Sequence, residues 1–337
     1  MSKIVLAVDV GYGNVKAAWG AESTNETEII FRSIANPVSK SSNSAVTTST
    51  GRVPIVVSGD TFMVGPDAYL SAGTSIADFD YVARKEYLAF LRGAMHFMFC
   101  KTGVYRKIDV LSVGLPVGNF ESQQETLIKL CKGEHEIPTP IPLVNALGPT
   151  VKVIVDKVVV VPQPIGALSV FARKCARSNK NMGSALIIDP GFKTLDWVFS
   201  NGMNVDMERS GSFAGGMSAL LREISGIVGK KLGVGYIDLV EVEKALSTGK
   251  IFAGGRSHDF TPFAGIVKDS AAKVIDKFFG ALDIDREFHS IVLTGGGAKY
   301  YRYAISEKFP GHTIQCEEDS VMDNVRGFYL VARGTMP

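Results

Sequence analysis

The chain has 337 residues, of which 46% are hydrophobic and 21% are charged, a composition typical of a folded globular protein and not of a disordered or fibrous one. At roughly 100 to 200 residues per domain, this length predicts about two domains, each large enough for its own core. The 36 basic and 34 acidic side chains give a formal net charge of +2, which excludes an overall attraction to nucleic acid or anionic membranes. Any contact with DNA would need a local patch or an adaptor.

The sequence favours a cytoplasmic location. Its first ten residues, MSKIVLAVDV, reach Asp9 before an apolar run long enough for a secretion signal has formed. The longest apolar stretch, Val158 to Ala172, is interrupted by two prolines and is shorter than the roughly 18 to 20 residues that cross a bilayer. The four cysteines form no C-x-x-C pair, so neither a zinc ribbon nor a disulfide framework is predicted.

The first half of the chain begins with a hairpin pattern, in which strands from Ile4 to Val8 and from Val15 to Trp19 flank a glycine-containing turn. Residues 39–50 are rich in serine and threonine and are interpreted as an exposed loop. Further along this half we predict a helix from Asp80 to Cys100, a strand from Val110 to Gly114, a helix from Phe120 to Cys131, and a strand from Val158 to Val161 that is buried on both faces.

A switch from strand to helix at Pro162 to Pro164 marks the expected boundary between two halves. The predicted elements of the second half, in chain order, are a helix from Gly166 to Arg177, strands at Ala185 to Ile188 and Leu195 to Phe199, helices at Met217 to Val228, Asp238 to Ser247 and Ala264 to Phe279, and a strand at Ile291 to Thr294.

The two halves share a motif. Residues 5–16 read VLAVDVGYGNVK and residues 185–196 read ALIIDPGFKTLD, so each is an apolar strand that ends in Asp-x-Gly and leads through a short turn into a second strand. This repeat predicts a duplication in which each half supplies one hairpin to a site between them.

The first hairpin has the residues of a phosphate cradle. Gly11 and Gly13 can adopt backbone angles that other residues avoid, so we expect them to bring backbone N–H groups close to an anion. Lys16 can place a positive charge on the same phosphates, and Asp9 can hold a metal-bound water. A simple hairpin turn is the alternative, and the G-x-x-x-x-G-K-[ST] pattern of a P-loop is absent.

The second hairpin offers a carboxylate at Asp189, a turn at Gly191 and a hydroxyl at Thr194. Two such hairpins suit a triphosphate with Mg²⁺, because each supplies one carboxylate and one turn. A third element, residues 291–298, is a strand that runs into three glycines and then a helix, which permits close backbone approach to a ligand. Alone, this last pattern is generic.

In this order, the three elements resemble the motifs of the actin-like ATPase superfamily. Residues 158–167 (VVVVPQPIGA) and 323–328 (DNVRGF) resemble its two connecting helices. Within it, the chain most resembles the ParM/StbA-type plasmid-segregation actins. The stretches VGLPVGNF, VVVPQPIGAL, IIDPGFKTLDW and RSGSFAGGMSALLREI look like the protein D type of PRTRC plasmid-associated systems.

The resemblance implies an α/β fold, the ribonuclease H-like duplicated two-domain ATPase fold with a nucleotide cleft between the domains. Domain I would span residues 1–163 and carry an inserted subdomain at about 35–110. Domain II would span residues 164–323, and residues 324–337 would form a helix that returns to domain I.

The resemblance also assigns roles to residues. Asp9 and Asp189 would hold Mg²⁺ through water, and Gln163 would orient the attacking water. Because glutamine cannot act as a strong base, hydrolysis would be slow. The expected nucleotide contacts are Gly11, Tyr12, Gly13, Asn14, Lys16, Gly191, Phe192, Lys193, Thr194, Asp196, Gly215, Gly216, Glu241, Lys244, Gly295, Gly296, Gly297 and Ala298.

Two of these assignments leave an alternative open. Gly215 and Gly216 would put N–H groups near the ribose or the phosphates, but they could equally be the plain start of a helix. Glu241 and Lys244 would contact adenine or ribose, but at a spacing of three residues they could equally form a surface ion pair.

The implied function is that of a filament-forming protein that hydrolyses ATP, or GTP, with Mg²⁺. It would assemble head to tail with itself and segregate or position plasmid DNA through a DNA-binding adaptor, with no membrane partner. Two other functions remain open at this point: a small-molecule kinase of the same superfamily, and a nucleotide-binding scaffold that does not polymerise.

Overall fold

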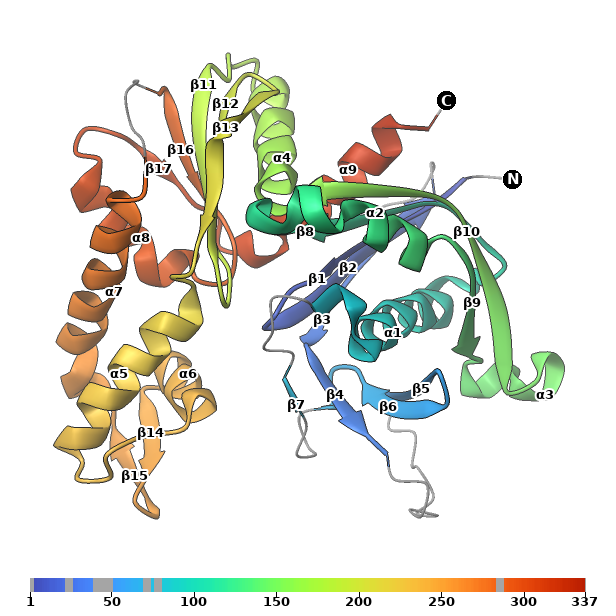
Figure 1. Ribbon diagram of the computed structural model, residues 1–337, viewed down its shortest axis with the longest axis horizontal. Coiled ribbons are helices and arrows are strands. Elements are labelled where there is room, and N and C mark those ends of the chain that lie inside the picture. Colours follow the sequence, from blue (N-terminus) through green and yellow to red (C-terminus); the bar gives the residue numbers. More distant parts are fainter. Residues whose placement is uncertain are drawn as a thin grey trace. The chain divides into compact units, whose positions relative to one another are not determined.

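The computed structural model describes residues 3–21, 27–38, 51–68, 74–75, 81–282 and 288–336 (Figure 1). The chain divides into two compact units, unit 1 with Met1–Val170 and Met322–Pro337, and unit 2 with Phe171–Val321. The first division lies within helix α4 (Gln163–Arg177), which begins in unit 1 and ends in unit 2. The polar stretch 39–50 lies outside the described residues.

Unit 1 is built on a mixed six-stranded sheet with the order β3-β2-β1-β8-β10-β9. Its central strand β1 is almost wholly buried, β8 and β10 continue parallel to it, and the strands at both ends of the sheet are antiparallel to their neighbours. The strands are β1 (Ile4–Val10), β2 (Asn14–Ala21), β3 (Thr27–Arg32), β8 (Lys107–Leu115), β9 (Gly133–Pro138) and β10 (Thr150–Pro162).

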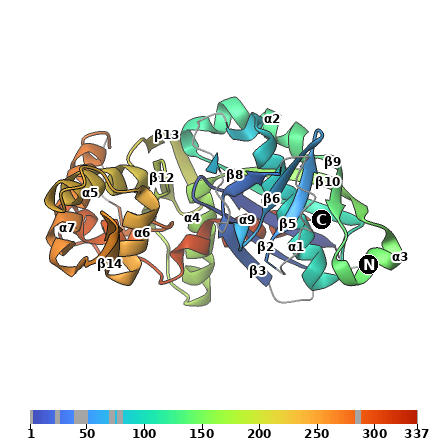
Figure 2. The same cartoon turned by 90° about the horizontal axis from the view of Figure 1, so that it is seen from below.

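A smaller sheet with the order β5-β6-β4-β7 lies between β3 and α1 in the sequence. Its strands are β4 (Ile34–Pro37), β5 (Val53–Val57), β6 (Asp60–Val64) and β7 (Thr74–Ser75). The helices of unit 1 besides α4 are α1 (Lys85–Thr102), α2 (Phe120–Cys131), α3 (Val144–Leu147) and α9 (Asp323–Gly334), with short 3-10 turns η2 (Tyr81–Ala83), η3 (Val117–Asn119) and η4 (Ile141–Leu143). Helix α1 packs against strands of both sheets, and α9 packs on β1 and β8 (Figure 2).

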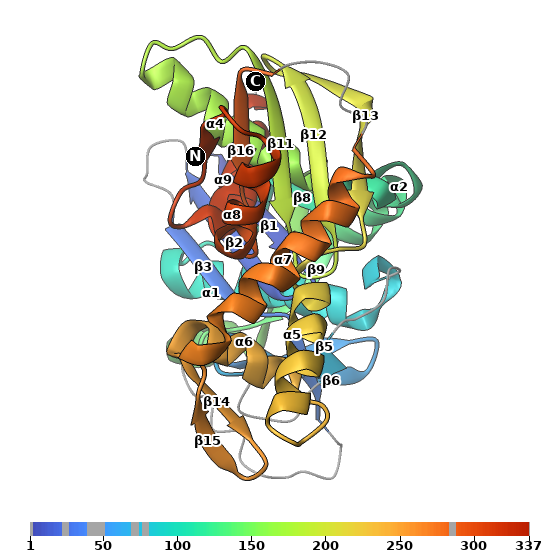
Figure 3. The ribbon, with the colours of Figure 1, turned by 90° about the vertical axis from the view of Figure 1, so that its left-hand side faces the viewer.

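Unit 2 is built on a five-stranded sheet with the order β13-β12-β11-β16-β17 and a separate pair, β14 and β15 (Figure 3). The strands are β11 (Ser184–Pro190), β12 (Leu195–Asn201), β13 (Asn204–Phe213), β14 (Lys250–Ala253), β15 (Arg256–Asp259), β16 (Ser290–Leu293) and β17 (Ile314–Gln315). The helices are α5 (Met217–Lys231), α6 (Leu239–Thr248), α7 (Ala264–Phe279) and α8 (Ala298–Lys308), with η5 (Thr261–Phe263) before α7, and η6 (Ser320–Met322) leads back to unit 1.

The two main sheets repeat one topology, which accounts for the sequence repeat. Strand β1 pairs antiparallel with β2 and parallel with β8, and β11 pairs antiparallel with β12 and parallel with β16. A further parallel strand follows in each sheet, β10 after β8 and β17 after β16. The predicted duplicated α/β fold is therefore confirmed.

Most predicted elements are present, and two corrections have a clear cause. The first predicted helix begins at Lys85 and not at Asp80, after the short turn η2. The valines 158–160 are only partly buried, not buried on both faces. The reason is that β9 pairs with Thr150–Val155 alone, so the second half of β10 has a neighbour on one side only among the described strands. Among the helices of the described ranges, none has the length and hydropathy needed to span a bilayer.

Candidate functional site

The first hairpin brings Asp9 and Lys16 together. They are cross-strand partners in the β1–β2 register, and the Lys16 Nζ lies 2.7 Å from Asp9 Oδ2. The Asp9 carboxylate is fully buried, so its charge depends on such partners for compensation. The structure thus places the predicted acid and the predicted phosphate-binding lysine at the mouth of one turn.

Gln163 reaches the same carboxylate from the start of α4. Its Nε2 donates to Asp9 Oδ1 over 2.9 Å, while Lys16 holds the other oxygen. An amide whose N–H₂ group is fixed in this way presents its carbonyl oxygen as an acceptor. The strand-to-helix switch that the sequence predicts at Pro162 is therefore what places Gln163 beside Asp9.

The turn of the first hairpin differs from expectation in its backbone angles. Neither Gly11 nor Gly13 has a positive φ, so the expected use of glycine-only angles is wrong here. Gly11 instead permits a close approach of the chain, because a Cβ at this position would lie only 3.1 Å from the Asn14 carbonyl oxygen. Tyr12 is buried beside the two glycines.

Ser33, which no sequence pattern indicated, holds this turn from the segment that follows β3. Its Oγ donates to the Gly11 carbonyl over 2.5 Å, and its N–H donates to the Gly13 carbonyl over 3.1 Å. The residue is 1% exposed. A serine nineteen or more residues away from a turn has no sequence signal that links it to that turn.

The second hairpin repeats the arrangement in unit 2. Asp189 and Asp196 are cross-strand partners, both buried, and the Thr194 hydroxyl donates to Asp196 Oδ2 over 2.6 Å. Gly191 again permits a close approach, since a Cβ at this position would lie 3.2 Å from the Thr194 carbonyl oxygen. The acid at position 196 stands where the first hairpin has Lys16, so the two turns are alike in shape and different in charge.

The start of α5 is bonded to this second turn. The N–H groups of Gly216, Met217 and Ser218 donate to the carbonyls of residues 193, 191 and 192, over 3.0, 2.9 and 2.7 Å. The Gly215 N–H donates to Phe213 over 2.8 Å. Because the N–H groups of both predicted glycines already have acceptors, these residues support the turn formed by Phe192 and Lys193 and bring the helix close to it.

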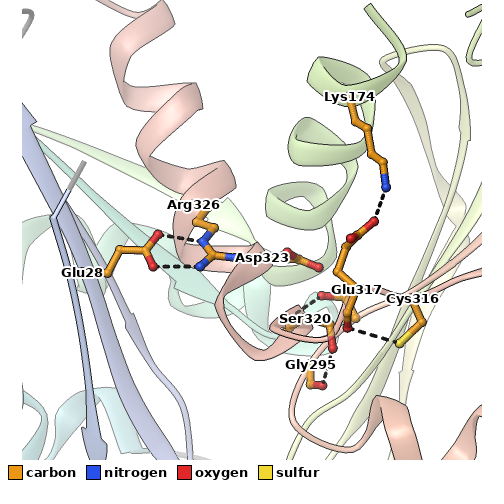
Figure 4. A network of polar contacts seen from close by, with 9 residues as sticks. Glu28, Lys174, Gly295, Cys316, Glu317, Ser320, Asp323 and Arg326 are labelled. Atoms are coloured by element: carbon orange, nitrogen blue, oxygen red, sulfur yellow. Dashed lines mark hydrogen bonds and ion pairs between the residues drawn. The ribbon is translucent and has the colours of Figure 1, made fainter. Parts of the chain in front are cut away.

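The glycine-rich turn after β16 lies against the second hairpin. Gly295 has φ of +79°, and a Cβ there would overlap Asp189. Gly297 donates its N–H to the Pro190 carbonyl over 2.9 Å. Figure 4 shows the contact between Gly295 and Ser320, which closes the turn from its other side. The turn after β16 and the second hairpin of unit 2 therefore meet at Asp189.

The remaining predicted contacts lie in the turn after β16 and on α6. Gly296 is exposed between its buried neighbours, and Ala298 is buried at the start of α8. Glu241 is half-buried and Lys244 is exposed on α6. No ion pair joins these two side chains among the described residues, so the surface-pair alternative lacks its contact.

Two helices cross beside the first hairpin at glycines. Gly166 of α4 and Gly327 of α9 lie so close that a Cβ on either would overlap the other helix, 2.7 Å from Asn324 Cα in the case of Gly166. Helix α9 is also tied to β3, where Arg326 makes a double contact with Glu28 at 2.7 and 2.9 Å (Figure 4).

Within the part of the chain that the structure describes, no three His, Cys, Asp or Glu side chains form a metal-binding group. Mg²⁺ needs no such group, because it usually keeps several waters and binds one or two carboxylates together with substrate phosphates. Asp9 and Asp189, each buried beside a hairpin turn, have the donor chemistry for that mode of binding.

Comparisons with known proteins agree with this architecture. Residues 7–166 match the family of N-terminal domains of actin-like proteins, and residues 187–307 match the C-terminal domain family of archaeal MreB-like actin homologues. No curated protein matches the sequence.

Solved structures share the fold at low identity. An archaeal actin homolog, Ta0583, has a TM-score of 0.77 and 20% identity, over 98% of this chain and 100% of that one. A 15-stranded ParM filament from Clostridium botulinum has a TM-score of 0.76 and 21% identity, over 99% and 100%. Ta0583 in complex with ADP has a TM-score of 0.73 and 19% identity, over 98% and 100%.

Proposed function

Because the chain belongs to the actin-like proteins, we propose that it binds ATP with Mg²⁺, hydrolyses it slowly, and assembles into filaments. The observation that carries the proposal is the repeat of one arrangement in both units: a buried aspartate next to the end of a buried strand, beside a tight hairpin turn in which a glycine lets a carbonyl oxygen approach closely. GTP is the alternative nucleotide, since both share the phosphates and the ribose.

Nucleotide binding is supported by the chemistry of the two turns. Lys16 and the backbone of residues 11–14 would hold phosphate oxygens, and Asp9 and Asp189 would hold the waters of Mg²⁺. The bound metal would supply charge neutralisation at the phosphates. The glycine turn 295–298 would accept the nucleoside, with Glu241 and Lys244 as the outer contacts.

Slow hydrolysis is supported by the contact between Gln163 and Asp9. With its amide nitrogen fixed on the carboxylate, Gln163 can orient a water through its Oε1 atom but cannot take a proton from it. Positioning without a strong general base is compatible with catalysis of phosphoryl transfer at a low rate.

Filament assembly is supported by the similarity to a protein whose structure was solved as a filament. We extend the proposal to segregation of plasmid DNA through an adaptor, with head-to-tail contacts between copies. Such contacts are heterologous, and a heterologous contact that does not close generates a helical filament.

Light scattering and electron microscopy with ATP, with ADP and without nucleotide test the proposal, together with phosphate release in the same samples. We expect polymer with ATP, and slow release of phosphate that requires Mg²⁺. A chain that binds ATP and forms no polymer over a range of protein and salt concentrations would contradict the cytoskeletal function. A chain that binds no nucleotide would contradict the whole proposal.

A further inference from the structure

Ser33 holds two carbonyl groups of the first turn at once. Its hydroxyl donates to the Gly11 carbonyl oxygen, and its backbone N–H donates to the Gly13 carbonyl oxygen. The strand register explains the position: Asn14 pairs with Arg32, so the next residue of that segment lies opposite Gly13.

Fixing a carbonyl also fixes the N–H group on the same peptide unit. A trans peptide is planar, and its N–H points opposite to its C=O. The Gly11 carbonyl shares a peptide unit with the Tyr12 N–H, and the Gly13 carbonyl shares one with the Asn14 N–H. Ser33 therefore sets the direction of both N–H groups, away from itself.

We propose that Ser33 is a positioning residue for phosphate binding, which orients the N–H groups of Tyr12 and Asn14 toward the phosphates. The inference rests on the proposed nucleotide binding and adds a residue from outside the hairpin to it. Since Ser33 is buried and both of its polar groups are used on the turn, the ligand would not touch it. Preorganised donors bind an anion without the cost of being reoriented.

The test compares ligands with and without phosphates on the whole chain. Ser33→Ala removes the hydroxyl and keeps the N–H contact. We expect about tenfold weaker binding of ADP, equivalent to about 1.4 kcal/mol, and unchanged binding of adenosine in equilibrium titrations. Ser33→Thr, which keeps a hydroxyl, should recover most of the ADP affinity.

Ser225→Ala is the matched control. Ser225 is also a fully buried serine, its Oγ donates to the Ile237 carbonyl over 2.6 Å, and the Ile237 N–H donates back to it over 2.9 Å. Its loss should lower stability without a selective loss of ADP affinity. If Ser33→Ala fails to fold, the nearly isosteric Ser33→Cys should show the same selective loss.

Wild-type ADP affinity in Ser33→Ala or Ser33→Cys would overturn the inference, as would an equal loss for ADP and adenosine in these two variants. A wild-type chain that binds neither ligand would instead count against the proposed function, so the two failures are distinguishable.

Discussion

Gly166 and Gly327 are in direct contact where α4 and α9 cross, and neither position has room for a Cβ. Gly327→Ala should therefore force the helices apart and lower the free energy of unfolding by about 1–3 kcal/mol, the usual cost of overpacking. Chemical denaturation measures the change. Gly334→Ala, in the last turn of the same helix with no atom within 4 Å of the added group, is the control and should stay within about 0.5 kcal/mol of wild type.

Gly295→Ala should be far more harmful than Gly296→Ala. The first position has φ of +79° and its added methyl group would overlap Asp189, whereas the nearest atom to a Cβ at the second is 3.8 Å away. Thermal unfolding and ADP titration of both variants check this. Equal behaviour of the two variants would mean that the turn after β16 is more tolerant than its contacts indicate.

Gln163→Ala should spare nucleotide binding and slow phosphate release by about tenfold to a hundredfold, because removing a water-positioning group raises the barrier without removing a phosphate contact. Single-turnover release of phosphate measures the effect. Gln124→Ala on α2 serves as the control. Unchanged release in the Gln163 variant would assign water positioning to another residue.

Asp189→Ala should abolish Mg²⁺-dependent hydrolysis, since it removes one of the two buried carboxylates proposed to hold the waters of Mg²⁺. Phosphate release over a Mg²⁺ titration is the measurement. Asp276→Ala, which removes only a surface contact to Lys308 at 2.6 Å, should keep wild-type turnover. Ordinary turnover in the Asp189 variant would show that the second hairpin is not the metal site.

Stability should fall on acidification, in part through His96. Burial lowers the pKa of this imidazole below its ordinary value, so the unfolded chain takes up a proton at a pH where the folded chain does not. The contribution is present above the ordinary histidine pKa near 6.5 and is lost as the pH falls toward the lower folded pKa. Denaturation at pH 7.5 and 5.5 should show a smaller difference for His96→Asn than for wild type. Cys100→Ser, which leaves the imidazole in place, should keep the wild-type difference.

Local signals in the sequence were sufficient to predict many of the helices and strands. The helix from Phe120 to Cys131 and the one from Ala264 to Phe279 begin and end where their apolar periodicity does. Pro162 ends its strand, and a helix follows at once. The repeated Asp-x-Gly pattern likewise predicted two hairpins with matching topology.

What escaped prediction depends on contacts between distant segments. The partial exposure of the valines in β10 follows from how far β9 extends beside them, which no local pattern encodes. The roles of Gly11 and Gly191 follow from the close approach of a carbonyl oxygen to each of them and not from unusual backbone angles. The contact of Ser33 with the first turn depends on the pairing of β3 with β2, which no local pattern in the sequence predicts.

Helix α9 packs on β1 and β8, and Arg326 reaches Glu28 across a separation of 298 residues. During synthesis on the ribosome, the whole of unit 2 is made before this helix exists. The part of unit 1 that Phe328 covers therefore stays exposed to water until α9 has been made, by which time all of unit 2 has been made. Unit 1 therefore begins first during synthesis and is completed last.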